Sequence, residues 1–129
     1  MAKAYDRVSW DFLRKILSRF GFQEAWINLV MQCVETIDFS VSINGVLTSY
    51  FKPQKGLRQG DPISPYLFVL VAEYLSRLIL NEQQKGNIKG IRITKHCPPM
   101  THSQFADDTV VFGELSALEI QSILAVLIK

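Results

Sequence analysis

The chain has 129 residues, of which 48% are hydrophobic and 20% are charged, a composition of a folded globular protein rather than a disordered one. Its length fits one domain with a sizeable core. The net charge of +2 is compatible with a polyanionic partner but too small to predict one, so any basic groove must come from local placement of lysine and arginine.

The cysteines and the apolar runs indicate the cellular compartment of the chain and whether it contacts a membrane. Cys33 and Cys97 lie far apart and lack the spacing of a metal site, so we expect two free thiols in a reducing, intracellular compartment. No signal-peptide pattern opens the sequence. The longest apolar run, residues 66–72, is followed by Glu73 and is well short of the roughly 20 residues of a membrane span. We therefore expect a buried helix there and no membrane partner.

Two amphipathic helices are predicted in the first third of the chain. Ser9 is a suitable N-cap for a helix through about residue 20, and Gly21 can end it. A second helix is predicted over residues 24–36. A stripe of apolar residues at helical spacing is expected to be its buried face, namely Trp26, Ile27, Val30, Met31 and Val34.

A β-hairpin is predicted next, where the periodicity changes from helical to alternating. Apolar and polar residues alternate over residues 39–43, and Asn44 and Gly45 form the strongest two-residue turn signal in the chain. Residues 46–51 are the predicted partner strand. This turn alone says little about function.

A polar loop, residues 52–65, leads into a long predicted helix over residues 65–84. The loop holds two glycines, three prolines and three basic residues, and Pro65 suits the first helical turn, where its missing N–H costs nothing. A loop that carries Arg58 and Gln59 and ends at a helix amino terminus is a reasonable site for a phosphate or a nucleotide. The alternative is an ordinary strand-to-helix connection.

The last third of the chain is predicted to contain short strands and one helix. A turn at residues 83–87 precedes a short strand at 91–94. Strands at 100–105 and 109–112 form a second hairpin, and Ser116 caps a helix over 118–127. No repeat or linker divides the sequence, so residues 1–129 are expected to be a single domain.

An acidic pair, Asp107 and Asp108, lies between the two strands of this second hairpin. Two adjacent carboxylates beside a core repel each other and lose hydration unless cations neutralise them, and hard oxygen ligands suit magnesium. Neighbouring side chains in a strand point to opposite faces, so both carboxylates can approach one ion cluster only if the pair lies in the tight turn. The alternative is a turn whose acids are merely solvated.

Three stretches together carry a family resemblance. They are residues 3–10 (Lys-Ala-Tyr-Asp-Arg-Val-Ser-Trp), 56–65 (Gly-Leu-Arg-Gln-Gly-Asp-Pro-Ile-Ser-Pro) and 105–108 (Phe-Ala-Asp-Asp). Their order and spacing closely resemble the reverse transcriptase palm of LINE-type non-LTR retrotransposons, especially the plant kind. The resemblance covers nearly the whole chain and implies an α+β fold, a small antiparallel sheet with helices packed on one face.

The resemblance also implies roles for individual residues. Asp107 and Asp108 match the family's catalytic aspartates, which bind two Mg²⁺ ions, and Asp107 matches the direct ligand. Tyr5 resembles the aromatic residue under the sugar of the incoming nucleotide, where it resists a ribose 2′-hydroxyl. The loop that positions template and nucleotide is matched by Arg58, Gln59 and Gly60. The implied partners are an RNA template, a DNA primer and deoxynucleoside triphosphates.

The family pattern extends beyond these residues. Its first motif has a metal-binding aspartate three residues before the lysine that Lys3 matches, which is ahead of Met1. Asp6 matches a later aspartate of that motif, and Asp11 is expected to be a solvated surface acid. The fingers and thumb of the family have no counterpart in the 129 residues, so the chain is expected to be a truncated palm fragment.

Two functional interpretations follow from the resemblance. One is an RNA-directed DNA polymerase palm with two-metal nucleotidyl transfer. The other, preferred for this chain by itself, is a non-catalytic retroelement remnant that binds nucleic acid weakly through Lys52, Lys55 and Arg58. Without a further strand the palm sheet would expose edges and apolar surface, so we expect marginal stability and self-association.

Overall fold

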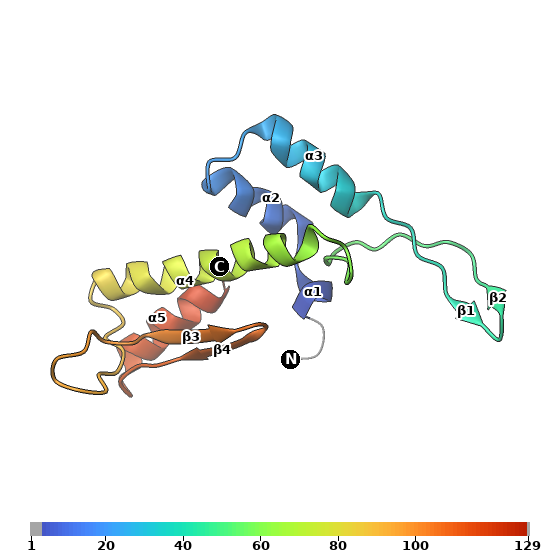
Figure 1. Cartoon of the computed structure of the whole chain (residues 1–129). Helices are drawn as coiled ribbons and strands as arrows, with labels where there is room; N and C mark the ends of the chain where they lie inside the picture. The colour runs from blue at the N-terminus through green and yellow to red at the C-terminus, as the bar shows by residue number, and fades with distance from the viewer. Residues whose placement is uncertain (1–3, 129) are drawn as a thin grey trace. The chain divides into compact units, whose positions relative to one another are not determined.

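A computed structural model describes residues 4–128 (Figure 1). The described residues fall into two compact units, 4–70 and 71–128, and the boundary lies within the longest helix. The mixture of helices and antiparallel hairpins confirms the predicted α+β class. The elements in chain order are α1 (Ala4–Arg7), α2 (Trp10–Arg19), α3 (Glu24–Glu35), β1 (Ser42–Ile43), β2 (Val46–Leu47), α4 (Ser64–Gln84), β3 (His102–Phe105), β4 (Asp108–Val111) and α5 (Ala117–Ile128).

Helix α2 forms where the capping signals predict it. The Ser9 side chain accepts a hydrogen bond from the Phe12 N–H at 3.5 Å, which satisfies one of the free donors of the first turn. Gly21, just after the helix, has a φ of +87°, a conformation that favours glycine. The helix buries one stripe of side chains, Leu13, Ile16 and Leu17.

Helix α3 packs against α2 through its apolar stripe. Ile27, Val30, Met31 and Val34 are buried, as predicted. The prediction was wrong for Trp26, whose side chain is 38% exposed. Its ring stacks on Phe22 at 4.3 Å between centroids, because two large rings can cover each other at the surface without entering the core.

The first hairpin, β1 with β2, confirms the Asn44-Gly45 turn. Both turn residues have positive φ, +51° and +83°, as a two-residue hairpin turn with right-handed twist requires. The ladder of this hairpin is short, and an isolated bridge between Phe39 and Phe51 joins the two chain segments that lead into and out of it.

The second unit is built from part of α4, the β3–β4 hairpin and α5. Its core consists of Ile79, Ile88 and Val126, with Val111 of β4 packed against them, so the helices cover one face of this two-stranded sheet. The Ser116 side chain caps α5 by accepting from the Glu119 N–H at 3.3 Å, as predicted.

Two expectations from the sequence need correction. Residues 91–94 do not form a strand: Ile91 alone pairs, in a single bridge to Met100, because the chain then turns back between Thr94 and Cys97. The apolar run at 66–72 is helical but not wholly buried, since Leu67 is buried whereas Tyr66 and Val69 face outward.

Across the described part of the chain, no helix has the length and apolar character needed to cross a membrane. The thiols of Cys33 and Cys97 are free and exposed.

Candidate functional site

In the first unit, the loop after the first hairpin is joined to the segment that opens the chain. The Gly56 N–H donates to the Val8 carbonyl and the Leu57 N–H to the Tyr5 carbonyl, both at 2.8 Å. The Trp10 indole Nε1–H donates to the Gly56 carbonyl, also at 2.8 Å. These three bonds bring the first two sequence motifs together across about 50 residues of intervening chain, a placement that periodicity could not predict.

Gly56 is required at this junction for two reasons. Its φ is +99°, a conformation that costs an L-residue energy. A Cβ at this position would also lie 3.0 Å from the Asp6 Cα and 3.1 Å from the Asp6 carbonyl oxygen. The close approach therefore explains why the second motif begins with glycine.

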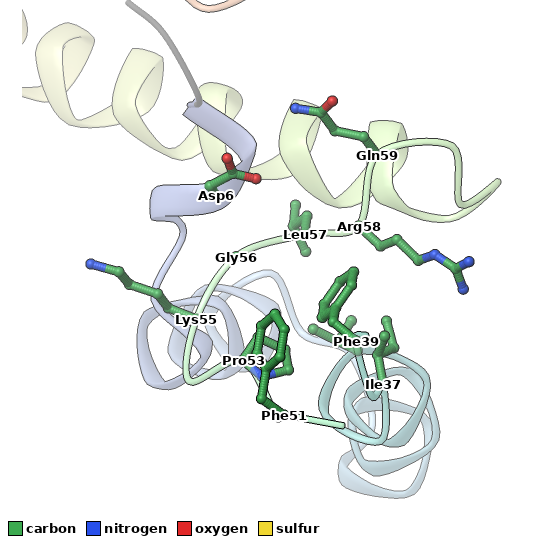
Figure 2. A pocket seen from close by; sticks show the side chains of 11 residues that line it. Asp6, Ile37, Phe39, Phe51, Pro53, Lys55, Gly56, Leu57, Arg58 and Gln59 are labelled. Carbon is green, nitrogen blue, oxygen red and sulfur yellow. The ribbon is translucent and has the colours of Figure 1, made fainter. Parts of the chain in front are cut away.

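A hollow of about 680 Å³ opens beside this junction, lined by both motifs and by the base of the first hairpin. Figure 2 shows Asp6 and Gln59 on one side of the Gly56–Arg58 backbone, and Phe39 and Phe51 on the other. Lys55 and Arg58 add positive charge at its edges. The sequence did not predict this aromatic wall, although two phenylalanines on either side of the predicted hairpin, Phe39 and Phe51, were a usable signal.

The structure places the remaining predicted nucleotide-site residues in the same unit. Tyr5 stacks on Phe68 of α4, with ring centroids 4.6 Å apart and planes 12° from parallel, so its ring orientation is fixed by packing. Gly60 has a φ of +87°. The Asp61 carboxylate then accepts from the Ile63 N–H at 3.0 Å and leads the loop into α4. Tyr5, Arg58, Gln59 and Gly60 thus lie on two segments in contact; their roles stay predictions.

The acidic pair lies at the tip of the second hairpin. The register pairs Phe105 with Asp108, which leaves Ala106 and Asp107 as the two turn residues. Asp107 is therefore in the tight turn, whereas Asp108 is the first residue of β4 and is exposed. The expectation that both acids lie in the turn, with the second strand starting at residue 109, was wrong for Asp108, because its backbone pairs with Phe105. Ala106 has a φ of +51°, so the turn holds a non-glycine residue in the left-handed region, at a cost of about 1–2 kcal/mol. Strained turns of this kind occur at functional sites.

Hydrogen bonds anchor the other end of β3 to α4. His102 Nε2 lies 2.7 Å from the Ser76 hydroxyl, and Nδ1 lies 3.0 Å from the Thr101 hydroxyl. Burial lowers the pKa of His102 below its usual value, and the negative charge of Glu73 opposes that shift. Sequence reasoning missed this anchor, because a lone serine and histidine 26 residues apart give no signal.

The donor set at the hairpin tip suits a hard divalent cation. Two adjacent carboxylates offer oxygen ligands of the kind that Mg²⁺ prefers. Within residues 4–128 no three His, Cys, Asp or Glu side chains gather in one cluster, and a metal role for Asp107 and Asp108 stays a prediction.

Comparison with known proteins identifies the family. Residues 1–128 match the family described as Reverse transcriptase (RNA-dependent DNA polymerase). An uncharacterized mitochondrial protein of Arabidopsis thaliana is 49% identical over 67 residues, which are 52% of this chain and 55% of that protein. The Pol polyprotein from the type-2 retrotransposable element R2DM of Drosophila melanogaster is 32% identical over 114 residues, 88% of this chain and 10% of that protein.

A third relative has the same pattern of partial coverage. The Pol polyprotein from the type-1 retrotransposable element R2 of Popillia japonica is 28% identical over 112 residues, 87% of this chain and 18% of that protein. The chain thus spans about half of the mitochondrial relative and less than a fifth of these two polyproteins. The predicted resemblance is confirmed, and the chain belongs to the reverse transcriptase family, of the LINE type found in non-LTR retrotransposons.

Proposed function

We propose that this chain supplies part of the nucleotidyl-transfer machinery of an RNA-directed DNA polymerase. The observation that carries the proposal is the acidic hairpin, with Asp107 in a strained two-residue turn and Asp108 next to it, within a chain matched over residues 1–128 to the reverse transcriptase family. In the proposed reaction a primer 3′-hydroxyl attacks the α-phosphorus of a deoxynucleoside triphosphate and pyrophosphate leaves.

Asp107 and Asp108 have the metal-binding role in this proposal. Two bound Mg²⁺ ions would lower the cost of deprotonating the 3′-hydroxyl and stabilise charge on the leaving pyrophosphate. The pairing of Phe105 with Asp108 places both carboxylates at one end of the hairpin. The hydrogen bonds of His102 with Ser76 and Thr101 hold the other end. A fixed position of the carboxylates favours catalysis because little reorganisation is needed on binding the ions.

The first unit has the nucleotide and template role. The hollow beside Gly56 combines cationic side chains, Lys55 and Arg58, with the amide of Gln59. Cations bind phosphate oxygens, and an amide can donate to and accept from a base or a sugar. The ring of Tyr5, held by Phe68, offers a flat surface that would exclude a 2′-hydroxyl.

The 129-residue polypeptide is proposed to be inactive as a polymerase by itself. A two-metal site needs carboxylates from separate strands, and within residues 4–128 the structure gathers no third His, Cys, Asp or Glu side chain with Asp107 and Asp108. Weak, salt-sensitive nucleic-acid binding through Lys52, Lys55 and Arg58 is then its measurable activity.

Primer extension on an RNA template with Mg²⁺ tests both parts of this proposal. We expect no extension by the 129-residue chain and extension once an upstream strand with the aspartate is joined to it. In that longer protein Asp107→Asn should lower the rate by at least about 100-fold, as expected for loss of a charge-stabilising ligand, and Asp11→Asn on α2 is the matched control. Extension by the short chain would refute its inactivity, and unchanged extension by Asp107→Asn would refute the metal role.

A further inference from the structure

The loop between α4 and β3 concentrates the positive charge of the chain. Residues 83–106 contain four lysines and arginines, Lys85, Lys89, Arg92 and Lys95, and no aspartate or glutamate. This stretch alone therefore carries twice the net charge of +2 of the whole chain, and the remainder is net acidic. A cluster of this kind is a strong local source of positive potential.

Two of these four cations are neutralised within the chain and two are not. Lys85 Nζ lies 2.7 Å from Glu82 and Lys89 Nζ lies 2.6 Å from Glu114. Among the described residues Arg92 and Lys95 have no such partner, and both are exposed. The charge available to another molecule is thus on the second half of the stretch.

The segment that carries Arg92 and Lys95 is held in a defined loop. At its neck Ile91 and Met100 exchange two backbone hydrogen bonds of 2.9 and 2.8 Å. Gly90 lets the two sides approach, since a Cβ there would lie 2.5 Å from the Met100 carbonyl oxygen. Near the tip the Cys97 N–H donates to the Thr94 carbonyl at 3.2 Å. The cations are therefore presented by an ordered backbone, which lowers the entropy lost on binding.

The surface at this loop combines a hollow, positive charge and an exposed apolar side chain. An open hollow of about 500 Å³ reaches from Gly86 to Arg92, with Lys89 and Glu114 also on its wall. Ile93 is 76% exposed between the two unpaired cations, so an apolar contact is available beside the charges. The loop joins β3 at the end of the hairpin opposite the acidic turn, as Figure 1 shows in orange.

We propose that the loop of residues 91–100 binds the phosphodiester backbone of a nucleic acid through Arg92 and Lys95, as a contact separate from the nucleotide and metal sites. The partner is a nucleic acid rather than another polyanion because the chain belongs to a family of RNA-dependent DNA polymerases. Contact with phosphates carries no base information, so the loop binds RNA and DNA alike. The inference depends on family membership and not on the roles of Asp107 or Arg58.

Fluorescence anisotropy with single-stranded RNA and DNA oligonucleotides of equal length, at several salt concentrations, tests the proposal. At about 0.1 M salt each lost phosphate contact should weaken binding by roughly fivefold to tenfold. The double variant Arg92→Gln/Lys95→Gln should therefore lose about 25-fold or more, and its salt slope should be shallower by about 1.4–1.8. The exchange Arg92→Lys/Lys95→Arg should retain wild-type binding, which separates charge from folding.

Matched controls decide whether the effect is local. Lys15→Gln/Lys85→Gln removes the same net charge from α2 and from a lysine already paired with Glu82, and should change affinity by less than about twofold. An equal loss in both double variants would overturn the proposal, because net charge alone would then explain binding. A tenfold preference for RNA or DNA through this loop, or tighter binding to phosphatidylserine vesicles than to either oligonucleotide, would also overturn it. Binding of a single deoxynucleoside triphosphate tests the proposed nucleotide site and should be the same in all these variants.

Discussion

Replacing Gly56 with alanine is expected to weaken the first unit more than the same change at a glycine in open space. The φ of Gly56 is +99°, and holding an L-residue at positive φ costs about 1–2 kcal/mol. The new Cβ would also press on the Asp6 backbone, 3.0 Å from Cα and 3.1 Å from the carbonyl oxygen. Both contacts are with backbone atoms, which cannot move aside as the end of a flexible side chain can, so the loop must shift.

That shift strains the bonds that join the two motifs. The Gly56 N–H to Val8 and Leu57 N–H to Tyr5 bonds are each worth about 1 kcal/mol. Part of the cost is offset because alanine reduces the entropy of the unfolded chain by about 0.4–1 kcal/mol. We expect Gly56→Ala to lower the free energy of unfolding by about 2–4 kcal/mol, and to weaken the nucleotide binding that we propose for the neighbouring hollow.

Urea unfolding monitored by tryptophan fluorescence measures this change. The matched control is Gly21→Ala, where φ is +87° but a Cβ would meet no atom within 4 Å; it should cost about 1 kcal/mol or less. If Gly56→Ala and Gly21→Ala destabilise the chain equally, the close approach to Asp6 has no energetic consequence and the reasoning is refuted.

Two further predictions concern the second hairpin. Ala106→Gly removes the strain of a φ of +51° but also raises the conformational entropy of the unfolded chain. The net effect should be a free energy of unfolding higher by about 0.5 kcal/mol. A loss of stability in urea unfolding would contradict this prediction. Because burial lowers the pKa of folded His102, the unfolded chain takes up that proton first as pH falls. Stability is then complete above about pH 6.5 and is lost as pH drops from there toward the lower folded-state pKa. His102→Gln should flatten this dependence in thermal unfolding curves between about pH 5 and 7, and an unchanged slope would contradict the assignment.

Local signals in the sequence predicted the local structure well. The Ser9 and Ser116 caps and the turn at Asn44 and Gly45 depend on short-range chemistry, and the structure has all of them. The prediction of a strand at residues 91–94 was wrong, because only Ile91 pairs, in one bridge with Met100, and the chain then turns between Thr94 and Cys97. β-Propensity describes suitability for a sheet, not the presence of a partner strand.

The candidate site was predictable as a set of residues but not as an arrangement. The motifs named Tyr5, Gln59 and Asp107. The contact of Gly56 with Asp6 and the bond from Trp10 to Gly56 join residues about 50 positions apart, and nothing in spacing or hydropathy encodes such a pairing. The exposed position of Trp26 could not be predicted either, because helical periodicity does not encode its stacking on Phe22.

The most direct test of the account is divalent-cation binding at the acidic hairpin, observed by NMR with Mn²⁺ as a paramagnetic probe that Mg²⁺ displaces. We predict selective broadening of the amide signals of residues 105–109 at low Mn²⁺, reversed by Mg²⁺ and absent in Asp107→Asn/Asp108→Asn. Asp11→Asn should leave the broadening unchanged. Broadening that is spread over the surface acids, or that survives loss of both hairpin carboxylates, would contradict the claim that Asp107 and Asp108 form the metal-binding part of a reverse transcriptase site.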